Sequence, residues 1–266
     1  MARRARLDAE LVRRGLARSR VQAAGLIAAG QVQVAGMAAG KAATQVSADT
    51  PITVRPDRQD PGYVSRGGHK LAGGLAAFPE LRVAGRRCLD AGASTGGFTD
   101  VLLRAGAGQV IAADVGYGQL AWSLRADPRV TVLDRVNVRA LEPAQVAPAP
   151  GVVTADLSFI SLTQVLPALA ACAEPEADFL LLVKPQFEVG KGNVGAGGVV
   201  RDPGLRADAV AAVARSAAEL GLGVCGVTAS PLPGPSGNVE YFLWLRRGAP
   251  PLDQAVLDAA IAQGPQ

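Results

Sequence analysis

The apolar positions near the start of the chain follow a helical pattern. One series of leucines runs through residues 7–16, and a second apolar series runs through residues 23–27. Both predict short amphipathic helices. Gly15 and Gly30 are placed to end them, and Ser19, with Gln22 three residues later, is placed to cap the second. The alternation in QVQVAG and the run ITV predict short strands. We therefore expect a small α+β module over residues 1–59.

After the polar stretch RPDRQDPGY the pattern changes to apolar runs that alternate with helix-like segments. The runs are RRCLDAG, QVIAADV, VTVLDR, GVVTADLSF, DFLLLVKP, GVCGVTAS and YFLWLR. Runs that are apolar on both faces and separated by helices predict a mainly parallel sheet covered on both sides. The last two, joined by SPLPGPSGN, predict an antiparallel pair. We expect a linker at residues 60–65 and an α/β domain over residues 66–266.

The net charge of +4 is concentrated at one end of the chain. Residues 1–20 hold seven arginines against Asp8 and Glu10, so this segment is more positive than the whole chain. Such a distribution suits phosphate, although a solvated basic surface would look the same on charge alone. Because the basic residues accompany a folded helical pattern, an RNA-binding module is favoured over a tail. The arginines are Arg3, Arg4, Arg6, Arg13, Arg14, Arg18 and Arg20.

The remaining composition excludes several classes of protein. No apolar segment follows the basic N-terminus, so we expect no secretory signal. No run approaches the roughly 18 uninterrupted apolar residues of a membrane span. Cys88, Cys172 and Cys225 are far apart, with no pairing pattern and no metal-like spacing. The sequence predicts a cytoplasmic protein with no metal site.

The stretch DAGASTGGFTD, beginning at Asp90, follows an apolar run and opens a helix-like segment. Its glycines would let a ligand approach the backbone beside a helix N-terminus. It has neither the Gly-Lys-Ser/Thr of a P-loop nor the spacing of G-x-G-x-x-G. Asp90 would repel a pyrophosphate but not a cationic cofactor that carries an amino acid. Asp114 ends the next run, where a ribose-binding acid belongs. A structural turn or an NAD site is the alternative.

This arrangement resembles the class I S-adenosylmethionine-dependent methyltransferases, which have a Rossmann-like fold. The resemblance implies S-adenosylmethionine as the cofactor. It implies that the methionine side of the cofactor is contacted by Asp90, Gly92, Ala93, Ser94 and Phe98. It also implies that the ribose is contacted by Asp114, Val115 and Gly116, and the adenine by Asn137.

Three methyl acceptors can be weighed against the residues. Methylation of a pyrimidine carbon needs a cysteine nucleophile at a strand end, and no cysteine is so placed. Methylation of an exocyclic amine typically uses a proline-containing turn, where this chain has DLSF at residues 156–159. A ribose 2′-hydroxyl needs a base, and a lysine serves where its surroundings favour the neutral amine. Lys184 and Asp156 end consecutive runs and should face the ligand-binding edge of the sheet.

Two further charges, Lys70 in SRGGHKL and Glu240 in GNVEYFLWL, are predicted to lie away from the surface. With Asp156 and Lys184 they resemble the Lys-Asp-Lys-Glu tetrad of FtsJ-type 2′-O-methyltransferases, whose mainly parallel sheet has seven strands. The resemblance implies that Lys184 is the base, that the two acids orient and balance the lysines, and that Lys70 positions the ribose. Taken one at a time, these residues also have interpretations without a catalytic role. A lysine at a strand end can reach solvent, Asp156 can cap a helix, and Glu240 can face solvent. His69, the one histidine, is an alternative base, although its surroundings are more typical of a phosphate-contacting or structural turn.

The N-terminal module resembles the RNA-binding domain of ribosomal-protein S-four type over about residues 5–55. In that family the helix pair presents basic residues to structured RNA, which here implies Arg4, Arg6, Arg18 and Arg20. The stretches SRGGHKL, KPQFEVGKG and GGVVRD read as basic or glycine-rich loops. They are either solvated or reach the RNA backbone through Arg66, Lys191 and Arg201.

Taken in order over about residues 1–247, these motifs resemble the TlyA family of rRNA (cytidine-2′-O)-methyltransferases, also named hemolysins, and particularly its actinobacterial members. The resemblance implies methylation of cytidines in 16S and 23S rRNA, ribosomal subunits as partners, and sensitivity to capreomycin-type antibiotics. No residue by itself specifies cytidine. The linker DPGYVSRGG lacks the arginine expected before its aromatic position. A 2′-O-methyltransferase of tRNA, a pore-forming hemolysin and a non-catalytic ribosome-binding factor are the alternatives.

Overall fold

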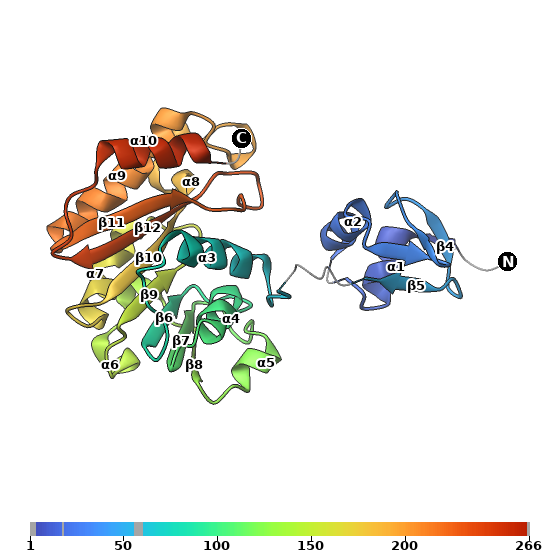
Figure 1. The fold of residues 1–266 in the computed structure, drawn as a ribbon, viewed down its shortest axis with the longest axis horizontal. Helices are drawn as coiled ribbons and strands as arrows, with labels where there is room; N and C mark the ends of the chain where they lie inside the picture. Colours follow the sequence, from blue (N-terminus) through green and yellow to red (C-terminus); the bar gives the residue numbers. More distant parts are fainter. Residues whose placement is uncertain (1–3, 18, 56–60, 265–266) are drawn as a thin grey trace. The chain divides into compact units, whose positions relative to one another are not determined.

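The computed structural model describes residues 4–17, 19–55 and 61–264. The chain forms two compact units, Met1–Gly62 and Tyr63–Gln266 (Figure 1). The linker predicted from composition, residues 60–65, spans this division. None of the helices in the described residues is long and apolar enough to cross a membrane.

The N-terminal unit packs two helices against short antiparallel strands. Strand β1 pairs with β4, and β2 lies between β3 and β5. Ser19 accepts a hydrogen bond from the backbone N–H of Gln22, and Gly15 and Gly30 have positive φ just beyond the helices. These observations confirm the predicted cap and both helix ends. The elements are β1 (Arg4–Arg6), α1 (Leu7–Arg13), α2 (Arg20–Ala28), β2 (Val32–Val34), β3 (Met37–Ala38), β4 (Gln45–Ser47) and β5 (Ile52–Val54).

Two acids of α1 are almost wholly buried, and arginines hold both of them. Glu10 accepts hydrogen bonds from Arg13 and Arg14, and these lower its pKa from 4.5 to about 2. Asp8 pairs with Arg6 and Arg20, and the hydrogen bond from Arg6 contributes most to lowering its pKa. Basic residues of this unit therefore stabilise its fold and also make its surface positive.

Acid should destabilise the N-terminal unit through Glu10. Its folded-state pKa is lower than its ordinary value, so its contribution is complete above about pH 4.5 and is lost as the pH falls toward 2. Hydrogen exchange of the amides of residues 4–54 in the full chain would follow this loss. In Glu10→Gln the protection should be lower at neutral pH and should change less with acid. An equal pH response in that variant would contradict the assignment.

The C-terminal unit is built on a seven-stranded sheet in the order β11-β12-β10-β9-β6-β7-β8. The five strands from β8 to β10 are parallel, and β12 runs antiparallel to both β10 and β11. All seven predicted runs are strands, and the α/β fold with a mainly parallel sheet is confirmed. The strands are β6 (Arg87–Ala91), β7 (Gln109–Asp114), β8 (Val130–Asp134), β9 (Val152–Ala155), β10 (Asp178–Val183), β11 (Leu222–Ala229) and β12 (Tyr241–Arg247).

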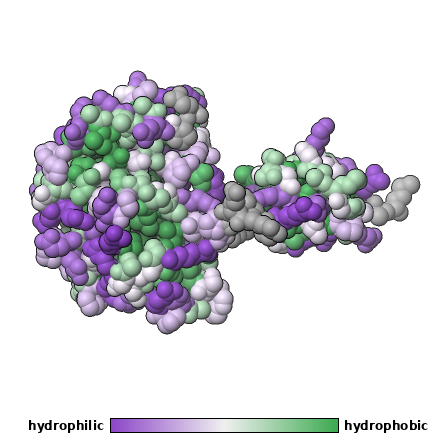
Figure 2. Space-filling view, in the orientation of Figure 1, coloured by the Kyte–Doolittle hydropathy of each residue, from purple (hydrophilic) through white to green (hydrophobic). Residues whose placement is uncertain are grey.

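Helices cover both faces of this sheet, as Figure 1 shows. Apolar side chains of α3, α4 and α5 pack with one face, and those of α6, α7, α9 and α10 pack with the other. On the face that Figure 2 shows, hydrophobic residues gather in patches over this unit, and hydrophilic residues lie around them. The helices are α3 (Arg66–Ala77), α4 (Gly97–Arg104), α5 (Trp122–Arg125), α6 (Pro143–Val146), α7 (Leu162–Cys172), α8 (Pro185–Glu188), α9 (Pro203–Glu219) and α10 (Gln254–Gln263), with short turns η1 (Val138–Ala140), η2 (Lys191–Asn193) and η3 (Ala196–Gly198).

The prediction that SRGGHKL is a loop is wrong, because these residues form the start of α3. Each glycine in a helix costs about 1 kcal/mol relative to alanine, so the composition argued against a helix. Close packing explains the glycines. A Cβ on Gly68 would lie 2.5 Å from the Tyr63 side chain, and one on Gly73 would lie 2.5 Å from Pro231. The second stretch, KPQFEVGKG, likewise contains α8.

Candidate active site

The four predicted catalytic residues form two ion pairs. Lys184 directly follows β10 and Asp156 directly follows β9, and these are parallel neighbours. Their side chains therefore meet at the carboxyl edge of the sheet, with Nζ of Lys184 2.6 Å from Oδ1 of Asp156. Lys70 of α3 donates a hydrogen bond to Glu240, which precedes β12, at 2.5 Å. The second pair is almost completely buried, with side chains 8% and 1% exposed.

Three of these residues share one hollow. Lys70, Asp156 and Lys184 line a depression of about 240 Å³ together with Gly97 and Phe98 at the start of α4. A substrate hydroxyl in this depression would meet two lysine side chains and a carboxylate. The arrangement can accept a proton and can orient the oxygen that loses it.

A second hollow, of about 380 Å³, adjoins the first. The two share Gly92, Ser94, Asp156 and Ser158 as lining residues. Seven of the nine predicted cofactor contacts line one or both of them. Gly92, Ser94, Asp114, Val115 and Asn137 line the larger hollow, and Ala93 and Phe98 line the smaller one.

Asp114 joins the two loops that form the larger hollow. Its carboxylate accepts hydrogen bonds from the backbone N–H of Ser94 at 2.8 Å and of Gly116 at 2.7 Å. Gly92 has positive φ, and a Cβ there would lie 2.7 Å from the carbonyl oxygen of Asp156. The glycine at the start of the loop is therefore needed for its close approach to the residue that pairs with Lys184. Gly116 supports Asp114 through its N–H and does not line either hollow.

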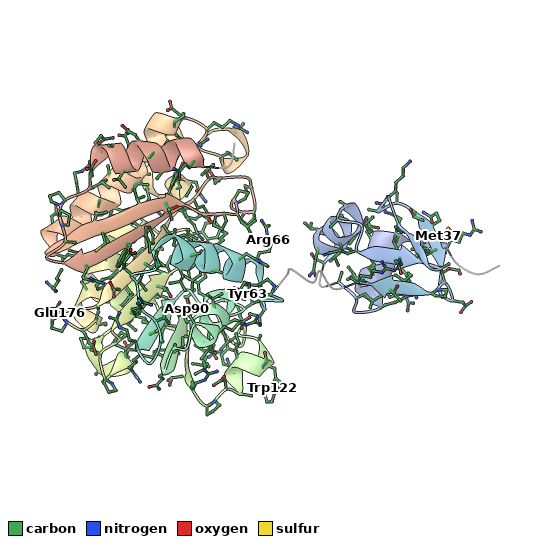
Figure 3. All side chains as sticks on the ribbon, viewed as in Figure 1. Met37, Tyr63, Arg66, Asp90, Trp122 and Glu176 are labelled. Atoms are coloured by element: carbon green, nitrogen blue, oxygen red, sulfur yellow. The ribbon has the colours of Figure 1, made fainter. Side chains whose placement is uncertain are left out.

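Asp90 lies inside the C-terminal unit, as Figure 3 shows, and does not line either hollow. It is fully buried and accepts a hydrogen bond from the Thr99 hydroxyl at 2.6 Å. Its other oxygen, Oδ1, has no hydrogen-bond partner within the described part of the chain. Burial raises the pKa of Asp90 to about 7. A direct contact to a cofactor stays a prediction, and an unpaired buried oxygen is the observation that supports it.

The cysteines are unsuited to nucleophilic attack. Burial raises the pKa of Cys88 to about 12, and burial also raises the pKa of Cys172 and of Cys225. Because the thiolate is the reactive form, these observations support the choice of an oxygen acceptor over a pyrimidine carbon.

The predicted RNA-binding residues fall in both units. Arg4, Arg6 and Arg20 are exposed in the N-terminal unit. Arg66 is exposed at the first position of α3 (Figure 3). Arg18 and the side chain of Lys191 lie outside the described residues. His69 packs edge-on against the Tyr63 ring, which supports the structural interpretation of this residue.

Sequence reasoning missed residues of the loop after β9. Ser158 accepts a hydrogen bond from Lys184 Nζ at 2.9 Å. Phe159 has positive φ and is 91% exposed. Gln119 and Val165 line the larger hollow. The DLSF motif itself was the available signal, because polar and aromatic residues directly after a buried strand lie at the ligand-binding edge.

Comparison with known proteins identifies the family. An FtsJ-like methyltransferase model matches residues 63–247, and an S4 domain model matches residues 5–52. The 16S/23S rRNA (cytidine-2′-O)-methyltransferase TlyA of Mycobacterium tuberculosis is 64% identical, and the match covers 100% of both chains. This chain belongs to the TlyA family of FtsJ-like methyltransferases. The predicted family resemblance, the S-four type module and the FtsJ-type domain are thereby confirmed.

Other members of this family carry different names. Hemolysin A of Brachyspira hyodysenteriae is 37% identical over 89% of this chain and 98% of its own. A solved structure from Streptococcus thermophilus described as a hemolysin has a TM-score of 0.77 at 36% identity, covering 99% of this chain and 96% of its own. The TlyA-family fold is therefore shared between chains named as methyltransferases and chains named as hemolysins.

Membership of this methyltransferase family implies S-adenosylmethionine as the methyl donor, and the residues fit such a cofactor. The larger hollow combines the Asp114 carboxylate with apolar Val115, Val136 and Val138. A carboxylate suits ribose hydroxyls, and apolar side chains suit a purine ring. Asp90, at the end of β6 before the loop, has one buried oxygen without a hydrogen-bond partner among the described residues.

Proposed function

We propose that this chain transfers a methyl group from S-adenosylmethionine to the 2′-hydroxyl of cytidine in 16S and 23S rRNA. The observation that carries the proposal is the Lys184–Asp156 pair, which lies where the smaller hollow meets the larger one. The 64% identity to the M. tuberculosis enzyme supports the choice of nucleoside and of rRNA. Altered sensitivity to capreomycin-type antibiotics stays a prediction.

In this proposal the cofactor is held by Gly92, Ser94, Asp114, Val115 and Asn137. When bound, it supplies an electrophilic methyl group on a sulfonium. Lys184 accepts the proton of the 2′-hydroxyl, and Asp156 stabilises the ammonium that results. Lys70, held by Glu240, lies in the same hollow and attracts the developing oxyanion. The burial of the Lys70–Glu240 pair fixes that ammonium in position.

The N-terminal unit is proposed to anchor the RNA. Exposed aromatic side chains of the C-terminal unit can add stacking on unpaired bases. Phe159 is 91% exposed beside the larger hollow, and Tyr117 is exposed with Arg135 over its ring. Recognition would then combine phosphate contacts from one unit with base contacts from the other.

Removing Arg4 should weaken RNA binding in a salt-dependent way. Each lost phosphate contact should lower the slope of log K against log salt concentration by about 0.7–0.9. Arg13→Ala is the matched control, because Arg13 is also exposed but pairs with Glu10 and is not a predicted contact. Filter binding to rRNA fragments at several salt concentrations would measure both. Equal slopes in Arg4→Ala and the unaltered protein would remove Arg4 from the interface.

The central test is transfer of labelled methyl from S-adenosylmethionine to isolated 30S and 50S subunits, with free rRNA and tRNA alongside. Nucleoside digestion should yield labelled 2′-O-methylcytidine from the subunits. Label on tRNA or on another nucleoside would retain the chemistry and overturn the target. Absence of label on any RNA would overturn the proposal. A hemolysin function would require lysis of erythrocytes by a variant that cannot transfer methyl groups.

A further inference from the structure

Ser158 contacts Lys184 but is not one of the four predicted catalytic residues. Its hydroxyl accepts the hydrogen bond that Lys184 Nζ donates, at 2.9 Å. Among the described residues, the Lys184 amine donates no other hydrogen bond, and the Ser158 side chain makes no other. Asp156 approaches the amine at 2.6 Å as an ion pair.

The two neighbours act on the amine in different ways. The Asp156 carboxylate lies 2.6 Å from the amine, where it balances the charge and attracts one N–H. A hydrogen bond is directional. The bond to Ser158 therefore sets which way the remaining positions of the nitrogen face.

Geometry then restricts where the lone pair can lie. A neutral lysine amine has two N–H bonds and one lone pair around its nitrogen. If Ser158 takes one N–H and the carboxylate attracts the other, the lone pair occupies the third direction. The hollow lined by Lys70, Asp156, Ser158 and Lys184 offers the space in which a substrate hydroxyl can meet it.

We propose that Ser158 is a positioning residue that aims the lone pair of Lys184 at the 2′-hydroxyl of the RNA. This inference rests on the proposed function. In the step that it serves, the 2′-oxygen bonds to the methyl carbon while the carbon–sulfur bond breaks and leaves its electrons on sulfur. The hydroxyl proton moves to Nζ of Lys184, and neutral S-adenosylhomocysteine is the second product.

Ser158 is suited to this role because the fold does not depend on it. It is exposed, in the loop between β9 and α7. Ser161, three residues later in the same loop, is different. It accepts a hydrogen bond from the N–H of Thr163 as the cap of α7, and it donates one to Glu188. The chain thus contains two nearby serines, one facing the base and one supporting the fold.

Ser158→Ala, Ser158→Thr and Ser161→Ala in the full chain test the proposal. In Ser158→Ala we expect kcat to fall by about tenfold or more. The KM for 30S or 50S subunits, the calorimetric Kd for S-adenosylmethionine and the melting temperature should stay unchanged. Ser158→Thr keeps the hydroxyl and should restore kcat. Ser161→Ala should lower the melting temperature with kcat near that of the unaltered protein.

The outcomes separate this inference from the function on which it rests. A normal kcat in Ser158→Ala, or a loss that Ser158→Thr does not restore, overturns the role of Ser158 while methyl transfer stands. A loss in Ser158→Ala that is matched by weaker cofactor or RNA binding overturns it as well, because the residue would then act in binding. An unaltered protein that methylates no RNA overturns the proposed function itself.

Discussion

Replacing Lys184 with alanine should reduce the rate of methyl transfer by about 10²–10⁴-fold, the usual contribution of a positioned general base. Lys184 lines the smaller hollow and not the larger one, so affinity for S-adenosylmethionine should change little. Asp156 loses its partner, but its side chain is 22% exposed and can be solvated. Single-turnover methylation with subunits in excess, together with calorimetry of cofactor binding, would measure both quantities.

Lys184→Arg distinguishes a base from a positive charge. Arginine keeps the charge beside Asp156 but does not deprotonate in proteins. If Lys184 accepts the hydroxyl proton, this variant should be about as slow as Lys184→Ala. If instead the residue only stabilises negative charge, Lys184→Arg should retain most of the activity. Substantial turnover in either variant would refute the assignment of Lys184 as the base.

Apolar runs predicted the strands of the C-terminal unit because buried strands need apolar side chains on both faces. DFLLLVKP and YFLWLR are examples, and every residue of β10 is buried. The order of the strands was not predictable from these runs. Strand β12 follows β11 in the chain but lies between β11 and β10, an arrangement that depends on contacts between distant residues.

Short and glycine-rich segments were the least predictable. Strand β1 has three residues, RAR, too few for a period to be recognised, and it forms by pairing with β4 some forty residues later. The start of α3 was mistaken for a loop because local propensity disfavours its glycines. Tertiary packing against Tyr63 and Pro231 decides the conformation there, and that packing leaves no local signal.

The site was predictable where it follows from sheet topology. Residues that end parallel strands share one edge, so the meeting of Lys184 and Asp156 could be expected. The direct pairing of Lys70 with Glu240 could not, since 170 residues separate them. Ser158 was missed for another reason. The DLSF motif indicates that this loop lies at the ligand-binding edge, but not which of its side chains contacts Lys184, and that depends on a single side-chain contact.

Breaking the Lys70–Glu240 pair should destabilise the C-terminal unit. Glu240→Ala leaves the Lys70 ammonium buried without its carboxylate, and removal of one partner from a buried pair typically costs about 3–5 kcal/mol. Both tryptophans, Trp122 and Trp244, lie in this unit. Urea unfolding followed by tryptophan fluorescence would therefore report its stability. A midpoint equal to that of the unaltered protein would contradict the burial of the pair.

Asp178→Ala is the matched control for a variant that loses stability but keeps the reacting residues. Asp178 is equally buried, at the start of β10, and is held by Arg86, Trp244 and Arg246. Because Lys184 follows the other end of that strand, Asp178 is far from the catalytic edge. This variant should lose comparable stability and retain methyl transfer at temperatures where it is folded. Glu240→Ala should lose both under the same conditions.

The double variant Lys70→Met, Glu240→Leu separates the two reasons for which a protein can keep a buried ion pair. Apolar side chains of similar size often replace such a pair with no loss of stability. We therefore expect the double variant to unfold at a urea concentration close to that of the unaltered protein, and well above Glu240→Ala. Its methyl transfer should still be lost, because no ammonium then faces the hydroxyl beside Lys184. A stable and active double variant would show that the pair has no part in the reaction. A stable and inactive double variant would show that the protein keeps the two buried charges for catalysis and not for stability.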